Sequence, residues 1–174
     1  MLLKSYRMEF TNVACRPEAQ SLHCIAHLEQ DVGAAIPYLN AVLGGSIYVR
    51  EPPAVTFRSQ GKLITVHADR IAINAIKDPA EAERILSWLQ REINEAWTKR
   101  GEITPSFTAA PRPQVMEIVK LLPKTNCGRC GQPTCMVFAA LAAEGGKGID
   151  DCPELAPENR HKLRDYLGRF RFDW

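Results

Sequence analysis

Four of the six cysteines in this 174-residue chain lie within one short stretch, and thiols at such spacing commonly bind metals. Cys127, Cys130, Cys135 and Cys152 follow the pattern C-x2-C-x4-C-x16-C, and a proline follows the last of them. Two kinds of centre accept four thiolates: a structural zinc ion and an iron–sulfur cluster. Zinc sites usually take their cysteines from two short knuckles, whereas here one loop supplies three and the fourth returns alone after a predicted helix. The pattern favours an iron–sulfur cluster, with zinc as the alternative.

The residues around these thiols suit a cluster. Gly128 and Gly131 have no side chain to block the approach of loop backbone N–H groups to inorganic sulfides. Thr134 or Pro133 begins a predicted helix, which places Cys135 in the first turn, where the helix dipole favours a thiolate. We therefore expect Gly128, Gly131 and Thr134 to contact the cofactor. Four apolar residues are expected to shield it from solvent: Met136, Val137, Phe138 and Leu141.

The stretch from Leu121 to Leu155 resembles the [4Fe-4S] domain of corrinoid/iron–sulfur protein large subunits and of the B subunit of Rnf-type complexes. The shared features are Leu-Pro-x-Thr-Asn-Cys, Cys-Gly, Pro-Thr-Cys and the distant Cys-Pro, within about 40 residues. The resemblance implies that each of the four cysteines binds one iron of a [4Fe-4S] cluster, and that the cluster carries one electron at low potential. It implies no corrinoid function, because the chain is too short for the barrel and cobalamin domains. The whole chain is similar to small two-domain iron–sulfur proteins of anaerobes.

Residues 1–103 are predicted to form an α+β domain, an antiparallel sheet with helices on one face. Short alternating runs separated by turns predict strands between residues 47 and 76, with further strands near residues 7–14 and 21–29. Asp31 and the Gly44-Gly45 pair bound one predicted helix, which Pro37 bends or restarts. A second helix begins at the N-cap Asp78 with Pro79 next, and is expected to hold Lys99 and Arg100 in its last turn before Gly101. The apolar positions of this second helix repeat at helical spacing, so it covers the sheet: Ile85, Leu86, Leu89, Ile93, Ala96 and Trp97.

Residues 104–113, rich in proline, are predicted to be a linker, and residues 114–174 a small all-α cluster-binding domain. Three helical patterns follow the linker, within residues 113–122, 133–146 and 157–170, and Gly145-Gly146 ends the second. A unit of this size has a small hydrophobic core and needs further stabilisation, which a metal centre supplies. The last helical segment is rich in arginine and lysine; such a run is usually a solvated face, and near a cluster it is a candidate docking site for an acidic redox partner.

Other residues that could do chemistry have simpler interpretations. Cys15, Cys24, His23 and His27 could form a second metal site, but a strand places both histidines on one face and Cys24 on the other. Buried free cysteines and ordinary strand histidines are favoured there, with a Cys15–Cys24 disulfide as a lesser alternative. His67 has no evident partner, and the sequence around Gly145 lacks the pattern of a phosphate-binding loop.

The bulk properties narrow the function. The 22 basic and 20 acidic residues give a net charge of +2, too small to indicate nucleic acid or an anionic membrane as a partner. The first residues lack the apolar core of a signal peptide, so we expect a cytoplasmic protein. No nucleophile–base pair, carboxylate dyad or nucleotide fingerprint is present, which disfavours independent catalysis.

The resulting hypothesis is that the protein is a one-electron carrier, or a redox accessory to a larger, anaerobic enzyme system. Its expected partner is a redox protein or a larger enzyme complex. Residues 1–103 are then the part that recognises the partner or a ligand. Two alternatives stay open: a binding or regulatory module with a structural or redox-sensing cluster, and a subunit or activator of a corrinoid methyl-transfer system. The sequence does not fix the oligomeric state.

Overall fold

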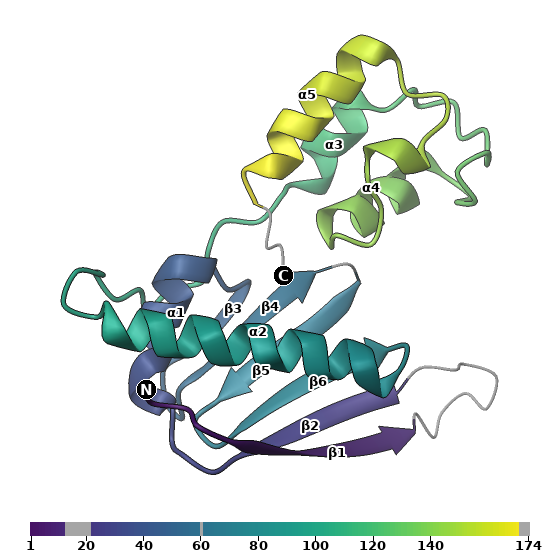
Figure 1. Cartoon of the computed structure of the whole chain (residues 1–174). Coiled ribbons are helices and arrows are strands. Elements are labelled where there is room, and N and C mark those ends of the chain that lie inside the picture. Colours follow the sequence, from purple (N-terminus) through teal and green to yellow (C-terminus); the bar gives the residue numbers. More distant parts are fainter. Residues whose placement is uncertain (13–21, 60, 171–174) are drawn as a thin grey trace. The chain divides into compact units, whose positions relative to one another are not determined.

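The computed structural model describes residues 1–12, 22–59 and 61–170 (Figure 1). The chain divides into two compact units, one built from residues 1–57 and 62–110 and the other centred on residues 111–170. The first unit holds the sheet and two helices, and the second is helical. The predicted α+β class, with an antiparallel sheet followed by a small all-α part, is confirmed.

The first unit contains one six-stranded antiparallel sheet with the strand order β1-β2-β6-β5-β4-β3. The strands are β1 (Tyr6–Asn12), β2 (Leu22–Leu28), β3 (Ile47–Val49), β4 (Ala54–Ser59), β5 (Lys62–His67) and β6 (Arg70–Ile76). Burial alternates along β5 and β6, as expected when one face of a sheet is covered and the other faces solvent. Leu28 donates its backbone N–H to the carbonyl of Asp69, which continues the β2–β6 pairing beyond the strand ends.

Two helices complete this unit. A 3-10 turn, η1 (Gly33–Ala35), leads into α1 (Ile36–Leu43), and α2 (Pro79–Thr98) runs across one face of the sheet (Figure 1). Pro37 lies in the first turn of α1, so the proline restarts the helix after the 3-10 turn. Gly44 ends it with φ 69°. Asp78 caps α2, accepting the Glu81 N–H at 2.7 Å.

The core lies between α2 and the covered face of the sheet. The expected face of α2 is buried, with Trp97 at its edge, and it packs on apolar strand residues: Cys24, Ala26, Val55, Phe57, Ile64, Val66, Ile71 and Ile73. Lys99 and Arg100 follow the last turn of α2 instead of lying within it, because the helix ends at Thr98. The Arg100 guanidinium stacks over the Trp97 ring at 4.3 Å from its centroid.

A buried ion pair sits at the start of α2. The Lys62 ammonium lies 3.1 Å from a Glu81 carboxylate oxygen, and both side chains are less than a tenth exposed. The other Glu81 oxygen accepts the Lys77 backbone N–H at 2.7 Å. Two buried charges are tolerated here because each has a partner of opposite sign.

Asn40 on α1 binds part of the predicted linker to the first unit. Its buried amide donates to the carbonyls of Ser106 and Thr108, each at 2.9 Å, while its oxygen accepts the Gly45 N–H at 2.9 Å. The Ala110 N–H in turn donates to the Gly45 carbonyl. Residues 106–110 are therefore held against α1 and the turn that follows it.

The second unit contains α3 (Val115–Leu121), α4 (Cys135–Ala143), the 3-10 turn η2 (Ile149–Asp151) and α5 (Pro157–Gly168). Its small core draws on all three helices: Ile118, Leu122, Phe138, Ala139, Ala142, Cys152, Leu155 and Leu163. Gly145 adopts φ 76°, and Gly146 donates to the Leu141 carbonyl, so the glycine pair ends α4 as predicted. No helix among the described residues has the length and apolar character needed to cross a membrane.

Candidate metal centre

The cysteine loop connects α3 to α4 through a backbone that turns repeatedly. Lys124, Asn126, Gly128 and Gly131 all adopt left-handed conformations, with φ between 50° and 77°. A Cβ on Gly131 would meet no atom within 4 Å, and one on Gly128 only a carbonyl oxygen at 4.0 Å. Both glycines therefore favour the positive φ that the loop adopts, and close packing gives no reason for them.

All four thiols of the C-x2-C-x4-C-x16-C pattern line a single pocket, although they come from three separate segments. Cys127 and Cys130 lie in the loop, Cys135 is the first residue of α4, and Cys152 follows η2. The pocket is completed by Leu122, Pro123, Thr125, Asn126, Gly128, Gln132, Thr134 and Phe138. Of the three other residues expected at the cofactor, Gly128 and Thr134 line the pocket and Gly131 does not.

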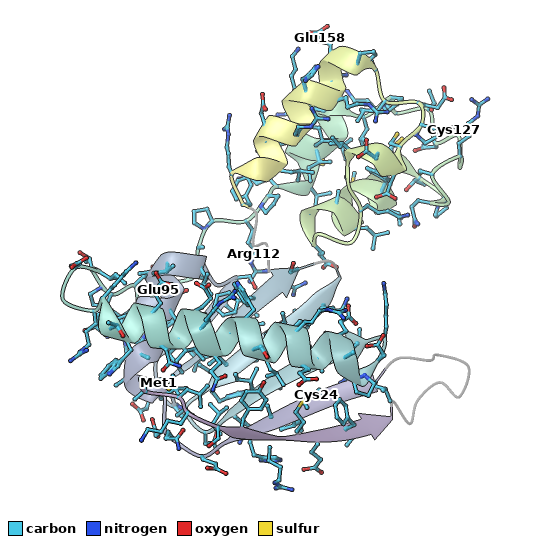
Figure 2. All side chains as sticks on the ribbon, in the orientation of Figure 1. Met1, Cys24, Glu95, Arg112, Cys127 and Glu158 are labelled. Carbon is cyan, nitrogen blue, oxygen red and sulfur yellow. The ribbon has the colours of Figure 1, made fainter. Side chains whose placement is uncertain are left out.

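Exposure differs sharply among the four thiols. Cys127 is exposed, Cys130 and Cys135 are partly covered, and Cys152 is buried in the core of the second unit. Cys127 lies on the outer loop of this unit (Figure 2). Whatever occupies the pocket therefore has one side near solvent and one side against the apolar core.

The protonation of two thiols differs from the ordinary case. The backbone N–H of Arg129 and the Thr125 hydroxyl donate to the Cys127 sulfur and lower its pKa, which favours the thiolate. Burial raises the pKa of Cys152, and the nearby Cys130, Cys135 and Cys127 add to the rise.

Two side chains fix the start of α4 beside the pocket. The Thr134 hydroxyl accepts the Val137 N–H at 3.2 Å, which caps the helix as the sequence predicts. The Asn126 side-chain oxygen accepts the backbone N–H of Cys135 at 2.8 Å. This bond ties the residue before the first cysteine to the third cysteine across the loop. Sequence reasoning missed Asn126. Its signal was its place directly before a cysteine, because asparagine tolerates the left-handed conformation that this loop adopts.

Two arginines hold the segment that carries the fourth cysteine. Arg129, between the first two cysteines, forms an ion pair with Glu154. Arg160 on α5 forms an ion pair with Asp150 at 2.9 Å and lies 3.5 Å from the Cys152 carbonyl oxygen. Ion pairs therefore hold the chain both two residues before and two residues after the fourth cysteine.

The apolar wall of the pocket differs from the expectation. Phe138 is buried and lines the pocket, but Met136 and Val137 are 47% and 38% exposed and do not. They point away because residues one and two positions past Cys135 lie on other faces of the helix. Leu122, at the end of α3, takes the place on the wall that sequence reasoning gave to them.

The second candidate site is not assembled by the described residues. Cys24 is a free, buried thiol on β2 (Figure 2). His23 and His27 lie on the opposite face of that strand, as the alternation of burial along it shows. The His27 Nε2 atom lies 2.9 Å from a Glu9 carboxylate oxygen on β1. Cys15 lies outside the described residues. Within the described ranges, no three His, Cys, Asp or Glu side chains are set to hold a single metal ion, and this includes the four pocket thiols. An iron–sulfur cluster differs from a single ion because its thiolates bind more than one iron.

The comparisons with known proteins converge on the cysteine segment. Residues 122–154 match the family described as "Putative Fe-S cluster". The gamma subunit of the acetyl-CoA decarbonylase/synthase complex of Methanothermobacter thermautotrophicus is 46% identical over 52 residues, which are 30% of this chain and 11% of that subunit. The corrinoid/iron-sulfur protein large subunit of Moorella thermoacetica is 48% identical over 48 residues, 28% of this chain and 11% of that subunit.

A third relative belongs to a different complex. The B subunit of the ion-translocating oxidoreductase complex of Azoarcus sp. (strain BH72) is 44% identical over 63 residues, 36% of this chain and 34% of that protein. No solved structure matches the chain. The chain thus corresponds to between a tenth and a third of the length of these relatives, and the matches support the resemblance stated from the sequence. Residues 122–154 therefore match an iron–sulfur cluster family and are similar in sequence to segments of subunits in three larger assemblies.

Proposed function

We propose that Cys127, Cys130, Cys135 and Cys152 bind one [4Fe-4S] cluster, and that the protein serves as a one-electron carrier for a larger enzyme system. The observation that carries the proposal is the convergence of four thiols from three segments on one pocket. Their chemistry fits the group, since four cysteine thiolates are the ligand set of a [4Fe-4S] cluster.

The chain's own groups suit a redox centre. Four cysteines would occupy all four irons, so no iron is left open for a substrate, which favours electron transfer over catalysis. The bound cluster would supply a one-electron couple whose potential depends on exposure and nearby charge. The exposed Cys127 edge offers a short path for an electron, and the buried Cys152 anchors the opposite side.

We further propose that residues 1–103 recognise the partner, with 104–113 as the connection and 114–174 as the cluster-binding domain. The three relatives are subunits of larger assemblies, which supports a protein partner for this chain too. Whether that partner belongs to corrinoid methyl transfer or to another anaerobic system is decided by what co-purifies with the native protein.

Anaerobic reconstitution with iron and sulfide tests the assignment. The reduced protein should contain about four irons per chain and give the EPR signal of a half-integer-spin [4Fe-4S]⁺ centre. Alanine at any one of the four pocket cysteines should lose or convert the cluster, whereas Cys24→Ala should keep the full iron content. A colourless protein that binds one zinc and gives no EPR signal would refute the proposal.

A structural or redox-sensing cluster is the second candidate, and one observation favours it. Cys152 belongs to the small core of the second unit, and Cys130 and Cys135 pack against that core. A cluster here would therefore stabilise the fold of this unit. A centre that cannot be reduced reversibly, but whose removal unfolds residues 111–170, would favour this role over electron transfer.

A further inference from the structure

β1 is the longer of the two edge strands of the sheet in the first unit. β1 is seven residues long and lies at one end of the sheet, with β2 on its inner side (Figure 1). Among the described residues no strand pairs with its outer side. Natural sheets protect such edges with very short strands, lysine, proline or bulges. The opposite edge strand, β3, is only three residues long, but β1 contains neither lysine nor proline.

The register of β1 with β2 shows which backbone groups face outward. Glu29 donates its N–H to the Ser5 carbonyl, so Ser5 and Glu29 form a hydrogen-bonded pair. The pairs alternate along an antiparallel ladder, so Arg7 and Glu9 also bond to β2. The backbone N–H and C=O groups of Tyr6, Met8 and Phe10 therefore point away from the sheet. Leu28, opposite Tyr6, agrees with this because its N–H bonds to Asp69 on the other side.

The side chains of β1 are complementary to those of a second copy of the same strand that runs antiparallel to it. The order is Tyr6, Arg7, Met8, Glu9, Phe10: an aromatic residue, a cation, a methionine, an anion and an aromatic residue. Antiparallel pairing of two copies about Met8 sets Arg7 opposite Glu9 of the second copy, twice. It also sets Tyr6 opposite Phe10 of the second copy, twice. Opposite charges and aromatic pairs across strands both stabilise a sheet.

The backbone leaves few other registers. Only residues whose backbone groups face outward can form the new hydrogen-bonded pairs, so Tyr6, Met8 and Phe10 must pair among themselves. A shift by one such step in either direction sets Arg7 opposite Arg7 of the second copy, or Glu9 opposite Glu9. Like charges directly opposite each other are destabilising. The alternation of outward-facing backbone groups and the positions of the charged residues together select the register centred on Met8.

The apolar residues of this strand provide a contact beyond the backbone. Tyr6, Met8 and Phe10 lie on the face that α2 covers, because their partners on β2 include the buried Cys24 and Ala26. Phe10 is 36% exposed there. Pairing would cover Phe10 with Tyr6 of the second copy. Arg7 and Glu9 lie on the open face, where Glu9 also contacts His27.

We propose that two copies of this chain associate through antiparallel pairing of β1 with β1, in the register centred on Met8, to form one continuous twelve-stranded sheet. The inference goes beyond the proposed electron-transfer function and does not depend on it, because every residue it uses lies in the first unit. A single strand pair is a small interface, so the association is expected to depend on concentration.

Analytical ultracentrifugation of the full chain tests the association, with and without a reconstituted cluster. Between about 1 and 500 μM protein, the mass should rise from 19.4 kDa toward twice that value. Met8→Pro removes an outward N–H without breaking a bond to β2, and should abolish the rise. A wild-type chain that stays monomeric throughout this range overturns the proposal, as does a dimer that persists in Met8→Pro.

Charge exchange tests the register. Arg7→Glu and Glu9→Arg should each weaken self-association about tenfold or more, because each replaces two attractive pairs by two repulsive ones. An equimolar mixture of the two variants should restore association, since every Glu then faces an Arg. Arg84→Glu, at an exposed position on α2, is the matched control and should dimerise as the wild type does. Failure of the mixture to associate when the wild type does would refute the register.

Amide hydrogen exchange gives a residue-level readout that fold stability alone would not produce. The amides of Tyr6, Met8 and Phe10 should exchange slowly at high concentration and quickly on dilution, whereas those of Arg7 and Glu9 should stay protected at both. Equal protection of all five amides, independent of concentration, would contradict the proposal.

Discussion

Arg129 and Glu154 form an ion pair that joins the cysteine loop to the segment of the fourth cysteine. Arg129 lies between the first two cysteines of the pattern, and Glu154 lies two residues after the last. The two segments are otherwise separated by α4 and its glycine stop. The pair therefore connects the two parts of the chain that must come together to close the pocket.

Removal of either partner should weaken cluster retention to a similar degree but shift the reduction potential in opposite directions. Arg129→Gln removes a positive charge and should lower the potential, while Glu154→Gln should raise it. A unit charge about 10 Å away in water-like surroundings is worth about 0.4 kcal/mol, or roughly 20 mV for a one-electron couple. Redox titration followed by EPR measures the shift, and the rate of iron loss to a chelator measures retention.

The exposed pair of Lys120 and Glu117 on α3 provides the control for this experiment. This ion pair lies within α3 and does not join the two cysteine segments. Lys120→Gln breaks it, and the rate of iron loss should stay unchanged. Potentials that move in the same direction for Arg129→Gln and Glu154→Gln would show that the charges act only through altered folding.

Thiol labelling of the metal-free protein should follow the order of exposure and pKa. Hydrogen bonds from Arg129 and Thr125 lower the pKa of Cys127, so its thiolate forms at lower pH than that of an ordinary cysteine. Burial raises the pKa of Cys152, so its thiolate forms only at higher pH. The rate of alkylation by iodoacetamide, followed by mass spectrometry from pH 6 to pH 9, should rise first at Cys127.

Cys24 is the internal reference for that measurement, because burial raises its pKa and the first unit covers it. It should remain unlabelled in the folded protein. Thr125→Val should move the labelling profile of Cys127 toward higher pH and leave Cys24 unchanged. A Cys127 profile that coincides with that of Cys152 would contradict the assigned environments.

The buried Lys62–Glu81 pair should make the stability of the first unit depend on pH and on both partners. Burial tends to raise the pKa of Glu81, but the Lys77 backbone N–H and the Lys62 ammonium outweigh it, so the pKa lies below its ordinary value. The stabilisation is therefore complete above the unfolded value of about 4.3 and is lost as pH falls through the lower folded value. Urea unfolding, followed through Trp88 and Trp97 fluorescence, reports this loss.

Lys62→Met should lower the free energy of unfolding at pH 7 by about 3 to 5 kcal/mol, because it leaves a buried carboxylate without its partner. The double variant Lys62→Met/Glu81→Leu removes both charges and should recover most of that loss. A single variant as stable as the wild type would show that water reaches the carboxylate.

Asn40 should control how firmly residues 106–110 are held. Asn40→Leu keeps a side chain of similar size but removes the hydrogen bonds to Ser106, Thr108 and Gly45, and leaves the buried Gly45 N–H without its side-chain partner. The expected cost is about 1 to 3 kcal/mol, with faster proteolysis within residues 103–111. Asn94→Ala, which removes side-chain bonds to the backbone near Leu3 instead, should not change cleavage at this segment.

Much of this fold is predictable because local signals agree with the tertiary structure. Asp78 and Pro79 mark the start of α2, and its apolar spacing correctly identifies the buried face. Alternation predicts the strands from β3 to β6, although it does not give the order that places β6 between β2 and β5. Strand order depends on contacts between segments distant in sequence, which a local pattern cannot encode.

The candidate site is predictable in its cysteines and less so in its surroundings. The cysteine spacing and the cap at Thr134 follow from local sequence, and the structure places all four thiols on one pocket. The roles of Asn126, Arg129 and Arg160 depend on partners from 9 to 25 residues away. Helical spacing places Phe138, three residues after Cys135, on the face of the pocket, and Met136 and Val137 on other faces.

The separation of Cys152 from the other three cysteines has a consequence for how the centre forms. Three of the proposed ligands lie within nine residues, so a nascent or unfolded chain can capture iron with them before any tertiary structure exists. The fourth arrives only when α4 has formed and Cys152 has entered the apolar core. Completion of the cluster would then act as a checkpoint, because only a correctly folded second unit can close the coordination.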